Sequence, residues 1–133
     1  MIEKIDHIGI VVKDLDEAMQ KFSEAFELKV SMVEQMDELN LKLAFIHIGE
    51  VMIELLAPTG PGMYQDFISK NGEGIHHICF KVSDISKALQ KVGRVLKLRD
   101  KEPRRGSGGS RIAFLDPSSI FNVETELVER KDS

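Results

Sequence analysis

Hydrophobic and polar positions along the chain follow the same order of patterns twice. In the first half, an Ile- and Val-rich run at 5–12 precedes a helical apolar period, and three short apolar runs follow at 28–34, 41–48 and 51–57. Short runs rich in β-branched residues indicate strands, whereas apolar residues spaced by three or four indicate an amphipathic helix. The first half is therefore predicted to fold as β-α-β-β-β.

The predicted helix has a clear start. Asp14 is the expected N-cap, and Glu17 three residues later completes a capping box. The apolar positions that follow at helical spacing are Ala18, Met19, Phe22 and Phe26. After Pro58 a connector predicts a further short helix from Met63 to Lys70, which stops at Asn71-Gly72.

The second half repeats this order. We predict a strand at 75–82, a helix from about Asp84 to Val95, a strand near 96–99, a glycine-rich loop at 106–110, and strands at 111–116 and 122–129. The modules then cover about 3–58 and 74–129, with a connector at about 59–73. Because neither module contains an internal break, we expect one α+β domain with internal pseudo-symmetry.

The repeat is also visible residue by residue. Residues 5–22 (IDHIGIVVKDLDEAMQKF) reappear as residues 75–92 (IHHICFKVSDISKALQKV), and the histidine at position 7 is matched at position 77. Alternate residues of a strand point to opposite faces. His76 therefore points away from the face that His77 occupies, and the repeat selects His77 from the pair.

Two carboxylates also occupy matching positions in the repeat. Glu54 and Glu126 each stand in an otherwise apolar strand, where an unpaired carboxylate is costly to bury. With His7 and His77 they form a symmetric set of two imidazoles and two carboxylates. This donor set suits Co²⁺, Mn²⁺, Ni²⁺ or Zn²⁺ and leaves open positions on an octahedral ion for substrate oxygens. We predict one divalent ion, with Co²⁺ as the first candidate.

Composition narrows the class of protein. The chain has 133 residues, 42% of them hydrophobic, and a net charge of −4, which is enough apolar material for a core and the wrong sign for a general nucleic-acid binder. Cys79 is the single cysteine, so no intramolecular disulfide can form and we expect the reducing cytoplasm. Lys4, Asp6 and His7 interrupt the first apolar run, and we expect neither a signal peptide nor a membrane span.

Several segments together resemble the vicinal oxygen chelate (glyoxalase/bleomycin resistance/dioxygenase) superfamily. They are DHIGIVV, IELLAP, GIHHICFKV, GSGG before a strand with AFLDP, and a terminal ELVE. The pattern is most similar to that of the methylmalonyl-CoA epimerases. The resemblance implies a glyoxalase-like fold, in which two βαβββ modules form a curled mixed sheet around a metal held by His7, Glu54, His77 and Glu126. It also implies a homodimer acting on a CoA thioester.

The activity implied by this resemblance is the interconversion of (R)- and (S)-methylmalonyl-CoA through a metal-stabilised enolate. We predict Glu126 as one base and Glu54 as its pseudo-symmetric counterpart. Some family members carry a further glutamate where this chain reads Lys42-Leu43-Ala44. Relatives often read HPKS followed by glycines where this chain reads DPSSIFN at 116–122, and Glu124 replaces an apolar residue.

Two other functions remain open from the sequence. A glyoxalase I-like lactoylglutathione lyase uses a similar His/Glu ligand pattern, and a non-catalytic binding or resistance module can share the fold without metal ligands. Near the glycine loop, Lys101, Arg104, Arg105 and Arg111 are candidates for binding the phosphates of a CoA tail, with a solvated charged loop as the alternative. His47 is expected at an exposed strand end and Cys79 as a small core residue.

Overall fold

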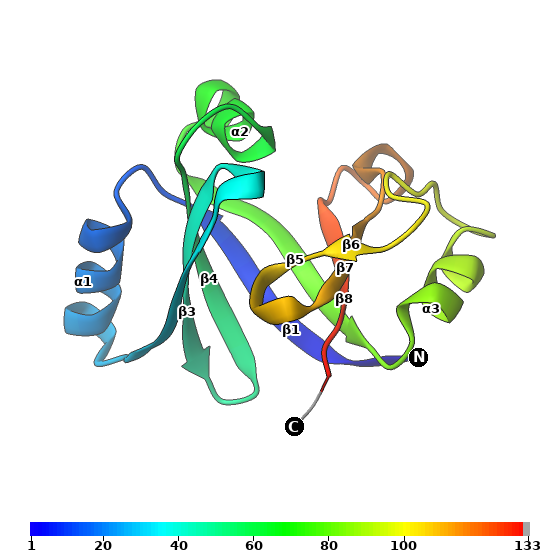
Figure 1. Ribbon diagram of the computed structural model, residues 1–133, viewed down its shortest axis with the longest axis horizontal. Helices are drawn as coiled ribbons and strands as arrows, with labels where there is room; N and C mark the ends of the chain where they lie inside the picture. The colour runs from blue at the N-terminus through cyan, green and yellow to red at the C-terminus, as the bar shows by residue number, and fades with distance from the viewer. Residues whose placement is uncertain (132–133) are drawn as a thin grey trace. The chain divides into compact units, whose positions relative to one another are not determined.

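The computed structural model describes residues 1–131 (Figure 1). These residues form two compact units. We call residues 7–76 the first unit, and residues 1–6 together with the chain from His77 onward the second unit. Strand β1 (Ile2–Val11) belongs to both, since its first half lies in the second unit and its second half in the first. That the chain is a single domain made of two modules stays a prediction.

The first unit contains four strands and two helices in the predicted order. Besides β1 they are α1 (Leu15–Phe26), β2 (Val30–Met36), β3 (Leu41–Ile48), β4 (Val51–Pro58) and α2 (Met63–Asn71). The strand order is β2-β3-β4-β1, with β1 parallel to β4 and the other pairs antiparallel. One apolar cluster of this sheet packs with α1 and another with α2.

The second unit repeats this arrangement with shorter elements. They are β5 (Gly74–Val82, from His77 onward in this unit), α3 (Ile85–Val92), β6 (Arg104–Arg105), β7 (Arg111–Phe114) and β8 (Thr125–Glu129). The strand order is β1-β5-β8-β7-β6, with β5 parallel to β8 and β7 antiparallel to both of its neighbours. Helix α3 packs on one face through Ile85, Ala88 and Leu89.

Both repeated helices begin as predicted. The side chain of Asp14 accepts a hydrogen bond from the backbone N–H of Glu17 at 3.0 Å. Asp84 does the same for Lys87, also at 3.0 Å. Each carboxylate satisfies a backbone donor that the first helical turn cannot. The strand–helix unit is therefore repeated down to its capping interaction.

Several predicted boundaries in the second half are wrong. The strands predicted at 111–116 and 122–129 are shorter, at Arg111–Phe114 and Thr125–Glu129. Helix α3 ends at Val92 rather than Val95, because the N–H groups of Arg94 and Val95 bond to the carbonyls three residues back, Lys91 and Val92, instead of four. Residues 96–99 form no strand but make one isolated bridge, between Leu98 and Leu115. The edge strand is instead Arg104–Arg105. The apolar residues of 96–99 pack against α3 and β7 from a turn, which periodicity cannot distinguish from a strand.

No helix within residues 1–131 is long and apolar enough to cross a membrane.

Candidate metal centre

The first unit holds a histidine–glutamate pair on neighbouring parallel strands. His7 Nε2 lies 3.2 Å from Glu54 Oε1, and these side chains are only 2% and 7% exposed. Glu54 stands opposite Gly9 in the register of β1 and β4. Gly9 shares a sheet face with His7, so the absence of a side chain there leaves room for the carboxylate to reach the imidazole. Phe45, the cross-strand partner of Glu54, packs edge-on against His7.

The second unit holds the same pair at the repeated positions. His77 Nε2 lies 3.2 Å from Glu126 Oε1, and these side chains are 1% and 6% exposed. Glu126 stands opposite Cys79, a small and fully buried residue at the position that Gly9 takes in the first unit. Phe114 pairs with Glu126 across the strands and packs edge-on against His77, with ring centroids 5.6 Å apart. The ring separation between His7 and Phe45 is also 5.6 Å.

This repeated geometry suits a divalent metal ion. Ligand atoms about 2.1 Å from an ion and at right angles to each other are about 3 Å apart, close to the nitrogen–oxygen separation in both pairs. An imidazole nitrogen and a carboxylate oxygen are ordinary ligands for Co²⁺, Mn²⁺, Ni²⁺ and Zn²⁺. Burial removes competing water from all four side chains. Within each unit the residues therefore fit half of a His₂Glu₂ ligand set.

His76 has a different environment from its neighbour His77. Its ring lies 5.0 Å from that of Tyr64 and 4.9 Å from that of Phe67, both on α2. Consecutive residues of β5 thus pack into different surroundings, as strand alternation requires. The prediction that His76 points away from the face of His77 agrees with these contacts. His47, at the end of β3, is exposed as predicted.

A buried ion pair beside the site was not predicted from the sequence. Asp6 precedes His7 and is 1% exposed, and it accepts a bidentate interaction from Arg130, with Arg130 Nε 3.0 Å from Oδ1 and Nη2 2.9 Å from Oδ2. The partners are 124 residues apart in the chain. The pair links β1 to the residue that follows β8, and Asp6 is not one of the predicted ligands. The only sign of this pair in the sequence is an acidic residue, Asp6, inside an apolar run.

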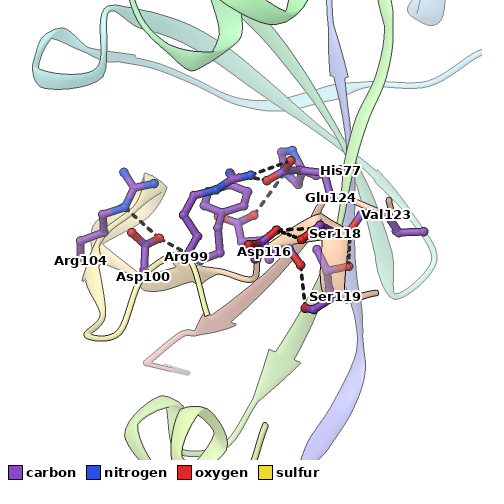
Figure 2. Close-up of polar contacts among 12 residues, drawn as sticks. His77, Arg99, Asp100, Arg104, Asp116, Ser118, Ser119, Val123 and Glu124 are labelled. Atoms are coloured by element: carbon purple, nitrogen blue, oxygen red, sulfur yellow. Dashed lines mark hydrogen bonds and ion pairs between the residues drawn. The ribbon is translucent and has the colours of Figure 1, made fainter. Parts of the chain in front are cut away.

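Arginines and carboxylates form a network of ion pairs in the second unit, Arg99 with Glu124 and Arg104 with Asp100 (Figure 2). The guanidinium carbons of Arg99 and Arg104 lie 5.8 and 5.6 Å from the centre of the Phe114 ring. Arg99 points toward Glu124 and is bound through both terminal nitrogens. Arg99 is therefore the partner of Glu124, which stands where the family resemblance led us to expect an apolar residue. The sequence alone did not identify this partner.

The segment 116–122, which differs from the family pattern, begins with hydrogen bonds between Asp116 and Ser118. Asp116 Oδ1 accepts hydrogen bonds from the backbone N–H of Ser118 at 2.9 Å and from its hydroxyl at 2.7 Å. These bonds lower the pKa of Asp116 below its ordinary value, the hydroxyl contributing most, with smaller contributions from the charges of Lys97 and Arg99. Asp116 therefore caps the short 3₁₀ turn Pro117–Ser119, and Ser118 inside the turn is its hydrogen-bond donor.

Comparison with known proteins gives a consistent assignment. The model of the Glyoxalase/Bleomycin resistance protein/Dioxygenase superfamily matches residues 6–114. An uncharacterised protein of Bacillus subtilis is 33% identical over 98% of this chain and 94% of its own. The ethylmalonyl-CoA/methylmalonyl-CoA epimerase of Cereibacter sphaeroides is 33% identical over 96% of this chain and 98% of its own.

Solved structures agree with this assignment. A variant of the Streptomyces coelicolor methylmalonyl-CoA epimerase, in complex with 2-nitronate-propionyl-CoA, has a TM-score of 0.93 at 34% identity and covers 97% of this chain and 95% of its own. The chain belongs to the glyoxalase/bleomycin resistance/dioxygenase superfamily and has its α+β fold. Its relatives place it among the epimerases of that superfamily, so it is an enzyme of the isomerase class.

Proposed function

We propose that the protein is a metal-dependent epimerase that interconverts (R)- and (S)-methylmalonyl-CoA through a metal-stabilised enolate. The observation that carries this proposal is the repeated histidine–glutamate pair, with 3.2 Å between nitrogen and oxygen in each unit. The substrate is taken from the relatives, which are epimerases of this thioester. The proposal therefore combines the chemistry of this chain's own residues with the substrate class of its family.

In this proposal both pairs ligate one divalent ion, through His7, Glu54, His77 and Glu126. The support is the exact correspondence of the four residues in the repeat, their burial and their donor chemistry. Co²⁺ is the first candidate, followed by Mn²⁺, Ni²⁺ and Zn²⁺. When bound, the ion would supply Lewis-acid stabilisation of the negative charge that develops on the thioester oxygen.

The protein's own part of the reaction is proton transfer at the α-carbon. We assign it to Glu126 and Glu54, one accepting the proton from one face of the substrate and the other returning a proton to the opposite face. Their Oε1 atoms lie on the histidine side, so we assign the transfer to the Oε2 atoms. On the strand where some relatives carry another glutamate, this chain reads Lys42-Leu43-Ala44, and Leu43 and Ala44 are buried.

The ligand in the Streptomyces coelicolor complex supports this chemistry. A nitronate is a planar, delocalised anion, and it therefore resembles the enolate that forms when a proton leaves the carbon next to a thioester. Compounds that resemble a high-energy intermediate bind best to sites built to stabilise it. An enzyme of this family is thus expected to act by α-proton removal.

Proton exchange in deuterated water tests the proposal. Wild-type protein loaded with Co²⁺ is expected to incorporate deuterium at the α-carbon of methylmalonyl-CoA and to interconvert the two epimers. Glu126→Gln and Glu54→Gln should each lower kcat by roughly 10²- to 10⁴-fold, because each removes a proton-transfer group. Glu102→Gln, which removes an exposed carboxylate in a loop, is the matched control and should retain wild-type rates.

Two outcomes would contradict the proposal in different ways. Turnover of a glutathione hemithioacetal, with no exchange of the thioester α-proton, would indicate the lyase. Protein that retains no divalent ion by elemental analysis, and whose ligand binding is unchanged by His7→Ala, would indicate a binding module.

The same proposal includes a homodimer working in the cytoplasm. The support is the family's usual assembly and the single cysteine, which is buried and has no second cysteine in this chain to pair with. Light scattering after size-exclusion chromatography should give twice the mass of the 15.0 kDa chain. The mass of a single chain would contradict the dimer without affecting the proposed chemistry.

A further inference from the structure

Four cationic residues flank the glycine-rich loop, and the structure separates them by sheet face. Arg104 pairs with Ile112 in the β6–β7 ladder, and Ile112 shares its face with Phe114. That is the face on which Phe114 stands opposite Glu126. The next residue, Arg105, pairs with Arg111 and lies on the other face.

The other three cations are poorly placed to serve the His77–Glu126 face. Arg111 is 3.8 Å from Glu129 Oε2, and Glu129 also binds the N-terminus of α3 through Oε1. Arg105 shares that α3-side face with Arg111. Lys101 is exposed and has no ion-pair partner among residues 1–131. Arg104 is therefore the cation of this group that the sheet directs toward the histidine–glutamate pair.

Asp100 holds the guanidinium of Arg104 in place through its Nε edge. Arg104 Nε donates to Asp100 Oδ2 at 3.2 Å, and the same oxygen accepts the backbone N–H of Phe114 at 2.8 Å. The group also lies over the Phe114 ring, whose edge contacts His77. A carboxylate fixed to the backbone and an aromatic ring thus orient the guanidinium, and one ring separates it from His77.

The outer edge of Arg104 is available to a ligand. Its two terminal nitrogens point away from Asp100 (Figure 2), and the side chain is 37% exposed. Within the described residues, Asp100 is its only ion-pair partner. Arg99 differs, because both of its terminal nitrogens are bound to Glu124. Of the two arginines beside Phe114, only Arg104 presents the forked donor edge that carboxylates and phosphates bind.

We infer that Arg104 is the anion receptor for the acyl-CoA substrate and binds one of its oxyanions, either the acyl carboxylate or a phosphate of the CoA tail. This inference rests on the proposed function for the identity of the ligand. Its basis is the pre-oriented fork beside Phe114, on the sheet face that carries His77 and Glu126. Pre-orientation matters because less side-chain entropy is lost when the ligand binds.

Steady-state kinetics of Arg104→Gln test this role. The KM for methylmalonyl-CoA should rise about tenfold or more, as expected for loss of a charge-assisted hydrogen bond, while kcat changes little. Arg104→Lys retains the charge but loses the forked pair of donors, so its KM should lie between those of wild type and Arg104→Gln. Arg105→Gln is the matched control, because it removes the same charge from the adjacent residue on the opposite face, and its KM should remain within about twofold of wild type.

A truncated substrate identifies the oxyanion. The methylmalonyl thioester of N-acetylcysteamine retains the carboxylate and lacks every phosphate. If Arg104 binds a phosphate, Arg104→Gln raises KM only for the CoA substrate. If it binds the carboxylate, KM rises for both substrates. Unchanged KM values for both substrates in correctly folded Arg104→Gln and Arg104→Lys would overturn the inference.

Equilibrium binding separates this inference from the proposed function. Calorimetric titration with methylmalonyl-CoA reports affinity whether or not the protein catalyses epimerisation. Weaker binding to Arg104→Gln than to Arg105→Gln would support the receptor even if wild-type protein exchanged no α-proton. Equal binding to both variants, with normal epimerase activity in wild type, would overturn the receptor and leave the epimerase intact.

Discussion

His77 Nε2 lies 3.2 Å from Glu126 Oε1, and the pair is almost completely buried. The same separation recurs between His7 and Glu54. Each histidine also packs edge-on against a phenylalanine that is the cross-strand partner of the glutamate. Duplication has therefore preserved a complete local arrangement of imidazole, carboxylate and aromatic ring, which a purely structural histidine would not require.

Adjacent histidines on β5 should respond in opposite ways to substitution. His76→Phe replaces a ring between Tyr64 and Phe67 with another ring, so the free energy of unfolding should change by less than about 1.5 kcal/mol. Metal content and activity should remain. His77→Ala should lose both. Metal analysis and chemical denaturation of the two variants check this, and metal loss in His76→Phe alone would reverse the assignment.

Asp6→Asn should be strongly destabilising. The substitution leaves Arg130 without its bidentate carboxylate partner, and breaking a buried pair in this way costs roughly 3 kcal/mol. Urea denaturation measures the change. Glu50→Gln, at the exposed turn between β3 and β4, is a control that should lie within about 0.5 kcal/mol of wild type. A similarly small change for Asp6→Asn would show that the pair contributes little.

Ser118→Ala should raise the pKa of Asp116. The Ser118 hydroxyl is the largest cause of the lowered pKa, so its removal should return the carboxyl toward its ordinary value. Because the folded pKa is lowered, the ionised carboxylate favours the folded state above the unfolded pKa, and this contribution is lost as the pH falls through the folded pKa. Carboxyl NMR titration measures the shift, with Ser86→Ala, at an exposed position of α3, as the control. An unchanged Asp116 pKa would contradict the assignment.

Gly106→Ala should destabilise the loop before β7. A Cβ at this buried glycine would lie 2.5 Å from Ile112 Cγ2 and 2.8 Å from Ser110 Oγ. Overpacking of this kind costs about 1–3 kcal/mol. Gly109→Ala adds the same methyl where nothing lies within 4 Å, although its φ of +74° is strained for alanine. Thermal denaturation that showed no loss for Gly106→Ala would mean that the loop adjusts freely.

Local sequence patterns predicted most of the elements. Asp14 and Asp84 marked both helix starts, because capping involves a residue only three positions away. Strand alternation separated His76 from His77. The errors occurred where a short apolar segment could be a turn or a strand, as at 96–99, because periodicity over four residues cannot distinguish them.

The sequence by itself determined the repeat, the α+β class and the identity of the four proposed ligands, since these depend on residue types and short-range periodicity. Tertiary structure decided which distant side chains meet. Asp6 with Arg130, Glu124 with Arg99, and Asp100 with Arg104 all depend on strand register and chain path. The last pair is only four residues apart in the chain, but Arg104 lies on the edge strand Arg104–Arg105, whereas the sequence pattern predicted that strand near 96–99. Charge pairing across a sheet is set by register, and register is not a local property.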